Sequence, residues 1–394
     1  MWIMSNKKQN QRPKPVVLMV LDGWGIATSY GGNAISQANT ANIKSYLAKY
    51  PAMVLTASGE GVGLPWGEAG NSEVGHLNLG LGRIIYQNLP RINKTIADGS
   101  FYKNKVLLKA IEQVKRNNSK LHLLGLTSNG AVHSSLDHLE ALIALMVENQ
   151  VDKFYVHAIL DGRDTPFNSG LNFIKEVETS LAGTKGKIAS LSGRFYAMDR
   201  DNHWDRTAKS YEAMALGLGE RYESAEQAIA ASYEKKIYDE EFMPTVITEA
   251  GQPVAKIEDG DAVIFFNYRP DRARALTKAF ILPGFEKFKR EKYLSIFFAA
   301  FTEYEKNLPA AIVFLPEVLK NTLGEILSQA GLKQLRIAET EKYAHVTYFF
   351  NGGREIKSLG EDHGLISSPA VSSYDLKPEK SALEVTHQVL KAIE

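Results

Sequence analysis

Short apolar runs alternate with longer amphipathic stretches along most of this 394-residue chain. The run Val16–Leu21 is typical, because it is continuously apolar and lacks the polar-apolar alternation of a half-exposed strand. Such runs predict strands that are covered on both faces. Strands that alternate with helices favour parallel sheets with crossover helices, so the sequence predicts an α/β fold.

The predicted elements extend over nearly the whole chain, and no repeat of fixed period interrupts them. The predicted strands cover residues 16–21, 53–57, 121–126, 153–160, 188–192, 262–266, 293–297 and 334–338. The predicted helices cover residues 35–50, 136–149, 172–181, 204–218, 272–281, 319–330 and 382–393.

Charge and composition exclude several classes of protein. The 46 basic and 45 acidic residues nearly cancel, so we expect no general attraction to nucleic acid or to an anionic membrane. The absence of cysteine excludes disulfides, thiolate metal sites and cysteine nucleophiles. Residues 1–13 are polar and basic, which predicts a flexible tail and not a signal peptide. Because no segment is long and apolar enough to span a bilayer, we expect a cytoplasmic protein.

The segment Gly70–His76, with the sequence GNSEVGH, places a small polar nucleophile among glycines at the predicted start of a helix. Gly70 and Gly75 leave room for an incoming group beside the Ser72 hydroxyl. The free N–H groups at a helix start favour an anion, such as a phosphate carried on this serine. Serine is also a common N-cap, so the alternative is that Ser72 only caps the helix.

Asp22 directly follows the predicted strand 16–21, at the sheet edge where open α/β folds build their sites. Asp22 and Ser72 together would offer oxygen donors to a divalent metal that activates the serine. The alternative is that Asp22 starts a turn with Gly23.

Several arginines follow predicted strands directly instead of lying on helix surfaces. Because the carboxyl ends of parallel strands meet at one edge of a sheet, we expect these side chains to gather there. A converging set of guanidinium groups predicts a small ligand with several negative charges, although any one arginine could simply form a surface salt bridge. The charged strand-end residues are Arg163, Asp164, Arg194, Arg200, Arg269 and Arg272, with Asp161 and Asp271 as acidic neighbours.

Two further side chains could act on an anionic group. His133 lies in a predicted loop between a strand and a helix, where it could donate to a phosphate or carboxylate or be structural. Lys342 is flanked by glutamates, which is typical of a solvated helix face. A lysine close to Ser72 could instead stabilise a phosphoryl group during its transfer.

Together these segments resemble the cofactor-independent (2,3-bisphosphoglycerate-independent) phosphoglycerate mutases, over about residues 15–394. The matching motifs, in chain order, are LDGWG at 21–25, GNSEVGH at 70–76, HAILDGRDTP at 157–166, SGR at 192–194, AMDRD at 197–201, FNYRPDRAR at 266–274, AETEKYAH at 338–345 and FFNGG at 349–353. The resemblance implies an alkaline-phosphatase-like domain, here residues 14–86 and 319–394. It also implies an inserted phosphotransferase domain that binds substrate, at residues 87–318.

The resemblance also implies an isomerase of glycolysis and gluconeogenesis that interconverts 3-phosphoglycerate and 2-phosphoglycerate without 2,3-bisphosphoglycerate. Ser72 would carry the phosphoryl group, and Asp22 with Ser72 would ligate one of two divalent metal ions, expected to be Mn²⁺. The substrate would be bound by His133, Arg163, Asp164, Arg194, Arg200, Arg269, Arg272 and Lys342. The family suggests a monomer whose partner is this small-molecule substrate.

Members of this family carry a further C-terminal segment with an Asp-x-x-x-His pair, an Asp-His pair and another histidine, which supply most metal ligands. In this sequence such spacings occur at Asp199…His203 and Asp362-His363, and we interpret both as coincidences. We therefore expect an incomplete metal domain that binds metal poorly and exposes apolar edge surface, which leaves the activity of the isolated chain open. A complementing C-terminal polypeptide, a truncated gene product and a partial sequence are alternative explanations.

Two other functions are compatible with the same residues. One is a metal-dependent phosphohydrolase of the alkaline phosphatase superfamily, in which water takes the phosphoryl group from Ser72. The other is a protein that binds phosphoglycerate without turning it over, which would depend on Arg269 and Arg272 but not on Ser72.

Overall fold

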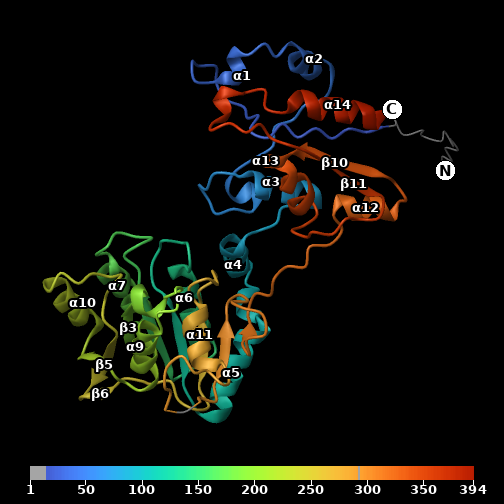
Figure 1. Ribbon diagram of the computed structural model, residues 1–394. Coiled ribbons are helices and arrows are strands. Elements are labelled where there is room, and N and C mark those ends of the chain that lie inside the picture. The colour runs from blue at the N-terminus through green and yellow to red at the C-terminus, as the bar shows by residue number, and fades with distance from the viewer. Residues whose placement is uncertain (1–14, 292) are drawn as a thin grey trace, which may run out of the picture. The chain divides into compact units, whose positions relative to one another are not determined.

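The computed structural model describes residues 15–291 and 293–394, so the tail predicted at residues 1–13 lies outside the described residues. The chain divides into two compact units (Figure 1). Unit 1 combines the N-terminal residues up to Ile85 with residues Leu319–Glu394, and unit 2 is the continuous segment Tyr86–Val318.

Unit 2 is built on one mixed sheet with the strand order β4-β5-β3-β2-β1-β7-β8-β9, and β6 pairs with β5. The pairs are parallel except that β5 is antiparallel to both β3 and β6. The strands are β1 (Leu121–Leu126), β2 (Phe154–Leu160), β3 (Lys187–Gly193), β4 (Glu220–Tyr222), β5 (Thr245–Glu249), β6 (Gln252–Pro253), β7 (Ala262–Phe265), β8 (Phe297–Ala300) and β9 (Ala311–Ile312). The predicted α/β fold with parallel pairing is confirmed.

The central strand β1 shows why the apolar runs of unit 2 become strands. All of its residues are buried, and its neighbours β2 and β7 pair with it in register from Leu121. Because side chains alternate along a strand, Leu123 enters one hydrophobic core and Leu124 enters the other. Helices α5, α6 and α7 contribute to the first core, and α9 and α11 contribute to the second.

The helices of unit 2 follow the expected alternation, with some that the sequence patterns did not reveal. They are α4 (Asn88–Ala97), α5 (Lys105–Asn117), α6 (Leu136–Glu148), α7 (Gly170–Leu181), α8 (Arg194–Ala197), α9 (Trp204–Ala215), α10 (Ala225–Glu234) and α11 (Arg274–Ile281). Of these, α4, α5, α8 and α10 were not predicted. The short 3-10 turn Phe101–Lys103 also lies in this unit.

Unit 1 contains a small parallel sheet of β10 (Gln334–Glu339) and β11 (Glu361–Ile366). Its helices are α1 (Ala34–Gln37), α2 (Ala41–Lys49), α3 (Ser72–Leu81), α12 (Leu323–Gln329), α13 (Thr340–Ala344) and α14 (Ala382–Ile393). A π-helical turn, His345–Phe349, continues directly from α13, and α3 packs against it.

The predicted strands 16–21 and 53–57 are wrong, because neither segment forms a strand. Their apolar side chains are exposed, from 38% for Val20 to 81% for Met53. A strand is stabilised by hydrogen bonds to a neighbouring strand, and no strand among the described residues pairs with either segment.

Three other predicted elements need correction, one because it is interrupted and two because they begin later than predicted. The helix predicted at 35–50 is interrupted at Ala38, which adopts an extended conformation between α1 and α2. The strand predicted at 293–297 begins only at Phe297, because its register follows β7, where Ala262 pairs with Phe297. The helix predicted at 319–330 begins at Leu323, where Thr322 and Glu325 form a capping box.

Among the described residues, no helix combines the length and apolarity that are needed to cross a lipid bilayer.

Candidate active site

Asp161, the residue that follows β2, organises the charged groups at the carboxyl edge of the sheet in unit 2. Its carboxylate is 1% exposed and accepts hydrogen bonds from the Ser128 hydroxyl at 2.6 Å and from the backbone N–H groups of Arg163 at 3.2 Å and Asp164 at 2.9 Å. It also accepts from Nη1 of Arg194 at 2.6 Å. Burial opposes its negative charge, but these hydrogen bonds prevail and lower the pKa of Asp161. Asp161 therefore fixes both the loop after β2 and the arginine after β3.

Arg194 lies directly after β3 and is itself 2% exposed. Its Nη1 lies 2.6 Å from Asp161 Oδ1 and 2.6 Å from Asp164 Oδ2. Burial disfavours its charge, but the hydrogen bonds and charges of Asp164 and Asp161 outweigh that effect and raise the pKa of Arg194. The guanidinium is thus a permanently charged part of the site floor.

Asp271 brings together two more of the predicted arginines. Its carboxylate lies 3.0 Å from Nη1 of Arg200 and 3.1 Å from Nε of Arg269. Burial raises the pKa of Asp271, but the charges of Arg269 and His133 and the bond from Arg200 lower it further than burial raises it. Both arginines are nearly half exposed, so their guanidinium groups remain accessible to a ligand.

His133 lies between the carboxylates of Asp164 and Asp271. Its ring nitrogens are 3.9 Å from Asp164 and 3.7 Å from Asp271, and the residue is 3% exposed. Burial, with the charge of Arg194 as the next cause, lowers the pKa of His133 to about 4. The imidazole is therefore neutral at pH 7 and can donate one hydrogen bond without adding charge.

Arg272 completes the cluster and donates from Nη1 to the backbone carbonyl of Met198 at 3.2 Å. Burial and the charges of Arg194, Arg200 and Arg163 lower the pKa of Arg272. The contacts of Arg194 with Asp164, of Arg200 and Arg269 with Asp271, and of His133 with both aspartates place these side chains together at the strand ends. A set of guanidinium groups this close is suited to a small ligand with more than one negative charge.

Unit 1 has its own group of candidate residues, at the start of α3. Asn71 is the N-cap of this helix, because its side-chain oxygen accepts from the Val74 N–H at 3.0 Å. The alternative that Ser72 caps the helix is therefore wrong, and the Ser72 hydroxyl is left for other partners. One of them is Nζ of Lys342, which lies 3.3 Å from Ser72 Oγ.

Lys342 also joins Ser72 to Asp22. Its ammonium lies 2.6 Å from Asp22 Oδ2. Burial raises the pKa of Asp22, but hydrogen bonds from Lys342 and Ser72 prevail and lower it. The alternative of a turn at Asp22 holds as well, since Gly23 has φ +85° and the Trp24 N–H bonds to the Leu21 carbonyl at 3.0 Å.

Two histidines that the sequence patterns did not single out lie close to this serine. Nδ1 of His76 is 2.8 Å from the carbonyl oxygen of Ser72, and the rings of His76 and His345 are 5.3 Å apart. The helical i, i+4 spacing of Ser72 and His76 was the available signal for the first of them.

The described residues of unit 1 do not form a complete site for a divalent metal. Within residues 15–291 and 293–394, no group of three or more histidine, cysteine, aspartate or glutamate side chains is arranged to hold an ion. Asp22 and Ser72 offer two oxygen donors, fewer than a divalent ion takes, and the Lys342 ammonium already lies against the carboxylate.

The residues at the two spacings interpreted as coincidences, Asp199…His203 and Asp362-His363, make contacts within their own segments. His203 is 3.0 Å from Asp199 in the loop before α9, where Asp199 also accepts from the His203 N–H. His363 lies in β11 and contacts Glu361 at 2.7 Å, and the neighbouring Asp362 side chain is 84% exposed.

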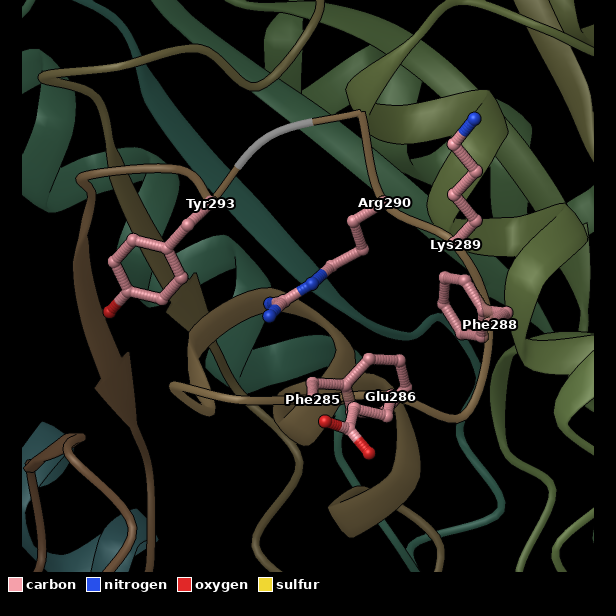
Figure 2. Close-up of a pocket in the computed structure, with 6 residues that line it drawn as sticks. All are labelled: Phe285, Glu286, Phe288, Lys289, Arg290 and Tyr293. Carbon is pink, nitrogen blue, oxygen red and sulfur yellow. The ribbon is translucent and has the colours of Figure 1, made fainter.

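A pocket on the segment after α11 is separate from these groups (Figure 2). Arg290 lies in it, with its guanidinium 5.1 Å from the ring centre of Phe285 and 5.6 Å from that of Tyr293. The same guanidinium donates to the carbonyl oxygens of Ala279 and Leu282 at the end of α11, at 3.0 Å each. Arg290 therefore satisfies free carbonyl groups at the C-terminus of α11. For this reason the pocket is not our candidate site.

Comparisons with known proteins agree on one family. Residues 92–306 match the family model described as "BPG-independent PGAM N-terminus". A 2,3-bisphosphoglycerate-independent phosphoglycerate mutase of Clostridium perfringens is 54% identical over 383 residues, which are 97% of this chain and 75% of the relative. That of Moorella thermoacetica is 51% identical with the same coverage. A crystal structure of Leishmania mexicana phosphoglycerate mutase at low cobalt concentration matches with a TM-score of 0.61 and 32% identity, over 91% of this chain and 68% of that chain.

Proposed function

Because the chain belongs to the family of 2,3-bisphosphoglycerate-independent phosphoglycerate mutases, we propose that it interconverts 3-phosphoglycerate and 2-phosphoglycerate through a phosphoserine on Ser72. The observation that carries this proposal is that Asn71 caps α3, which leaves the Ser72 hydroxyl free of that role and 3.3 Å from the Lys342 ammonium. A serine that only stabilised α3 would use its hydroxyl as the cap and would not need an ammonium group beside it.

The residues of unit 1 have distinct roles in the transfer. The bond from phosphorus to the substrate oxygen breaks as a bond to Ser72 Oγ forms, and the Ser72 proton passes to the released substrate oxygen. The second transfer returns the phosphoryl group to the other hydroxyl of glycerate, whose proton goes back to Ser72. Lys342 is placed to offset the negative charge on the phosphoryl oxygens. Asp22, at 2.6 Å, orients that ammonium.

The residues of unit 2 bind the anionic groups of the substrate. Arg163, Arg200 and Arg269 present accessible guanidinium groups for the carboxylate and phosphate of phosphoglycerate. Buried Arg194 and neutral His133 provide a fixed positive charge and a hydrogen-bond donor. Holding the glycerate while its phosphate is on Ser72 favours mutase activity over hydrolysis, because the acceptor hydroxyl is retained.

The metal requirement is proposed from family membership alone. The family implies two divalent ions, for which we propose Mn²⁺, and Asp22 and Ser72 would be oxygen donors to one of them. These two donors do not by themselves complete a site for a divalent ion. We further propose a cytoplasmic monomer whose partner is the small-molecule substrate.

The substitution Ser72→Ala tests the proposal. We expect the formation of 2-phosphoglycerate to fall by roughly 10⁴-fold or more, as is usual when a nucleophile is removed. A coupled assay should measure 2-phosphoglycerate and free phosphate separately in the presence of Mn²⁺. Ser36→Ala, at an exposed serine of α1 in the same unit, is the control.

Other outcomes would favour the other functions. Release of free phosphate in place of 2-phosphoglycerate would indicate the phosphohydrolase. Binding of 3-phosphoglycerate that needs Arg269 and Arg272, with no turnover before or after Ser72→Ala, would indicate a binding protein.

A further inference from the structure

The segment Asp239–Phe242 lies between α10 and β5 and supplies none of the predicted site residues. It contacts two loops of the site, one with an accessible arginine and one with a buried arginine. One is the loop between β2 and α7, which carries Arg163. The other is the junction of β3 and α8, which carries Arg194. These two loops are far from residues 239–242 in sequence, so only the fold brings them together.

The loop that carries Arg163 is attached to Asp239 at several points. The Asp239 N–H donates to the Phe167 carbonyl at 3.1 Å, and the Asp239 carboxylate accepts from the Gly170 N–H at 2.7 Å. Gly162 has φ +68°, and a Cβ there would lie 2.7 Å from the Glu240 nitrogen. Only glycine therefore permits this approach of the two backbones.

The junction that carries Arg194 is attached to the other end of the segment. The Gly193 N–H donates to the Phe242 carbonyl at 2.8 Å, and the Phe195 N–H donates to the Glu240 carbonyl at 3.0 Å. Arg194 lies between these two bonded residues. The segment therefore fixes the spacing between the two arginine loops.

Glu240 adds a side-chain contact to this framework. Its Oε1 accepts from Nη1 of Arg163 at 3.2 Å, and the two side chains are 27% and 54% exposed. Free arginine side chains sample many rotamers, and their immobilisation on a ligand costs affinity. We propose that Glu240 is a positioning residue that holds Arg163 in a conformation ready to bind the anionic substrate, an inference that rests on the proposed function.

The chemistry of Glu240 allows an opposing effect that a test must separate. Its carboxylate is negative, so it also repels an anionic ligand at Arg163. If repulsion dominated, removing the carboxylate would tighten binding. If positioning dominates, removal weakens binding, and an uncharged hydrogen-bond acceptor of the same shape restores it.

The experiment is calorimetric titration of 3-phosphoglycerate into the full chain. We expect Glu240→Ala to weaken binding roughly three- to ten-fold, because Arg163 must then be ordered by the ligand. Glu240→Gln should stay within about two-fold of the parent, since its amide oxygen can still accept from Arg163. In an Arg163→Ala background, Glu240→Ala should have no further effect. Glu249→Ala, which removes an exposed carboxylate 2.7 Å from Lys187 in the same unit, is the matched control.

Each other outcome has a defined meaning. Unchanged or tighter binding by Glu240→Ala overturns the proposal, and so does an equal loss when Arg163 is already absent. If Glu240→Ala does not fold, Glu240→Asp takes its place, because the shorter side chain keeps the charge but cannot reach Arg163 in the same way. Failure of the parent chain to bind 3-phosphoglycerate would count against the proposed function instead.

Discussion

The two units use similar apolar segments with opposite results. In unit 2, the run Leu121–Leu126 is buried along its whole length between β2 and β7. In unit 1, the run at residues 16–21 is as apolar but is exposed and forms no strand. Apolarity alone therefore does not make a strand, because the backbone also needs a partner for its hydrogen bonds.

The ion pairs of the two units differ in the same way. Arg194 and Asp161 in unit 2 are 2% and 1% exposed, whereas Lys342 and Asp22 in unit 1 are 37% and 24% exposed. The first pair is part of the interior, and the second remains available to a reacting group. Burial thus distinguishes a fixed charge in the floor of the site from a charge that a reacting group can reach directly.

The strongest test of this contrast is the substitution Arg194→Met. We expect it to lower the free energy of unfolding of unit 2 by about 3–5 kcal/mol, because it leaves the buried Asp161 carboxylate without its cation. Lys342→Met should cost less than about 1 kcal/mol, since Asp22 can be solvated. Urea denaturation followed by tryptophan fluorescence measures both. Equal costs for the two variants would contradict the contrast.

A second test compares leucines in the two apolar runs. Leu123→Ala removes a side chain that is 0% exposed and should destabilise unit 2 by about 2–5 kcal/mol. Leu18→Ala removes one that is 62% exposed and should change stability by less than about 0.5 kcal/mol. The same denaturation experiment applies. A large cost for Leu18→Ala would show that residues 16–21 are buried in solution.

The third test concerns how the stability of the protein depends on the protonation of His133 at acidic pH. Its pKa is about 4 in the fold against 6.5 for an ordinary histidine, so the unfolded chain binds more protons between these values. The stability that depends on its neutral form is complete above pH 6.5 and is lost as the pH falls towards 4. His133→Gln should therefore reduce the loss of stability between pH 7 and pH 5 by about 2 kcal/mol. An unchanged pH dependence in thermal unfolding would mean that the histidine is not held neutral.

The inner strands β1, β2 and β7 of unit 2 could be predicted from the sequence, because they are apolar runs with neighbours on both sides, whereas β4, β5, β6 and β9 were missed. The strand predicted at 121–126 coincides with β1, and the helix predicted at 382–393 in unit 1 coincides with α14. By contrast, β11 was missed, since its sequence EDHGLI is largely polar and its strand conformation depends on pairing with β10.

The candidate site shows a similar division. The rule that parallel strands end at one edge was sufficient to predict that Arg163, Arg194 and Arg272 would gather. It could not show that Asp161 would accept four hydrogen bonds, or that Glu240 would reach Arg163. Those contacts depend on side-chain directions and on a loop more than 70 residues away, which no local pattern contains.

The opposite directions of Leu123 and Leu124 in β1 have a consequence for how the protein can change. Neighbours in the chain face separate interiors, and each interior packs against its own set of helices. Replacements can therefore accumulate on one side of the sheet without compensating replacements on the other, since the two clusters share no packed residues. Successive residues of one strand can thus be replaced independently during evolution, because each belongs to a different hydrophobic core.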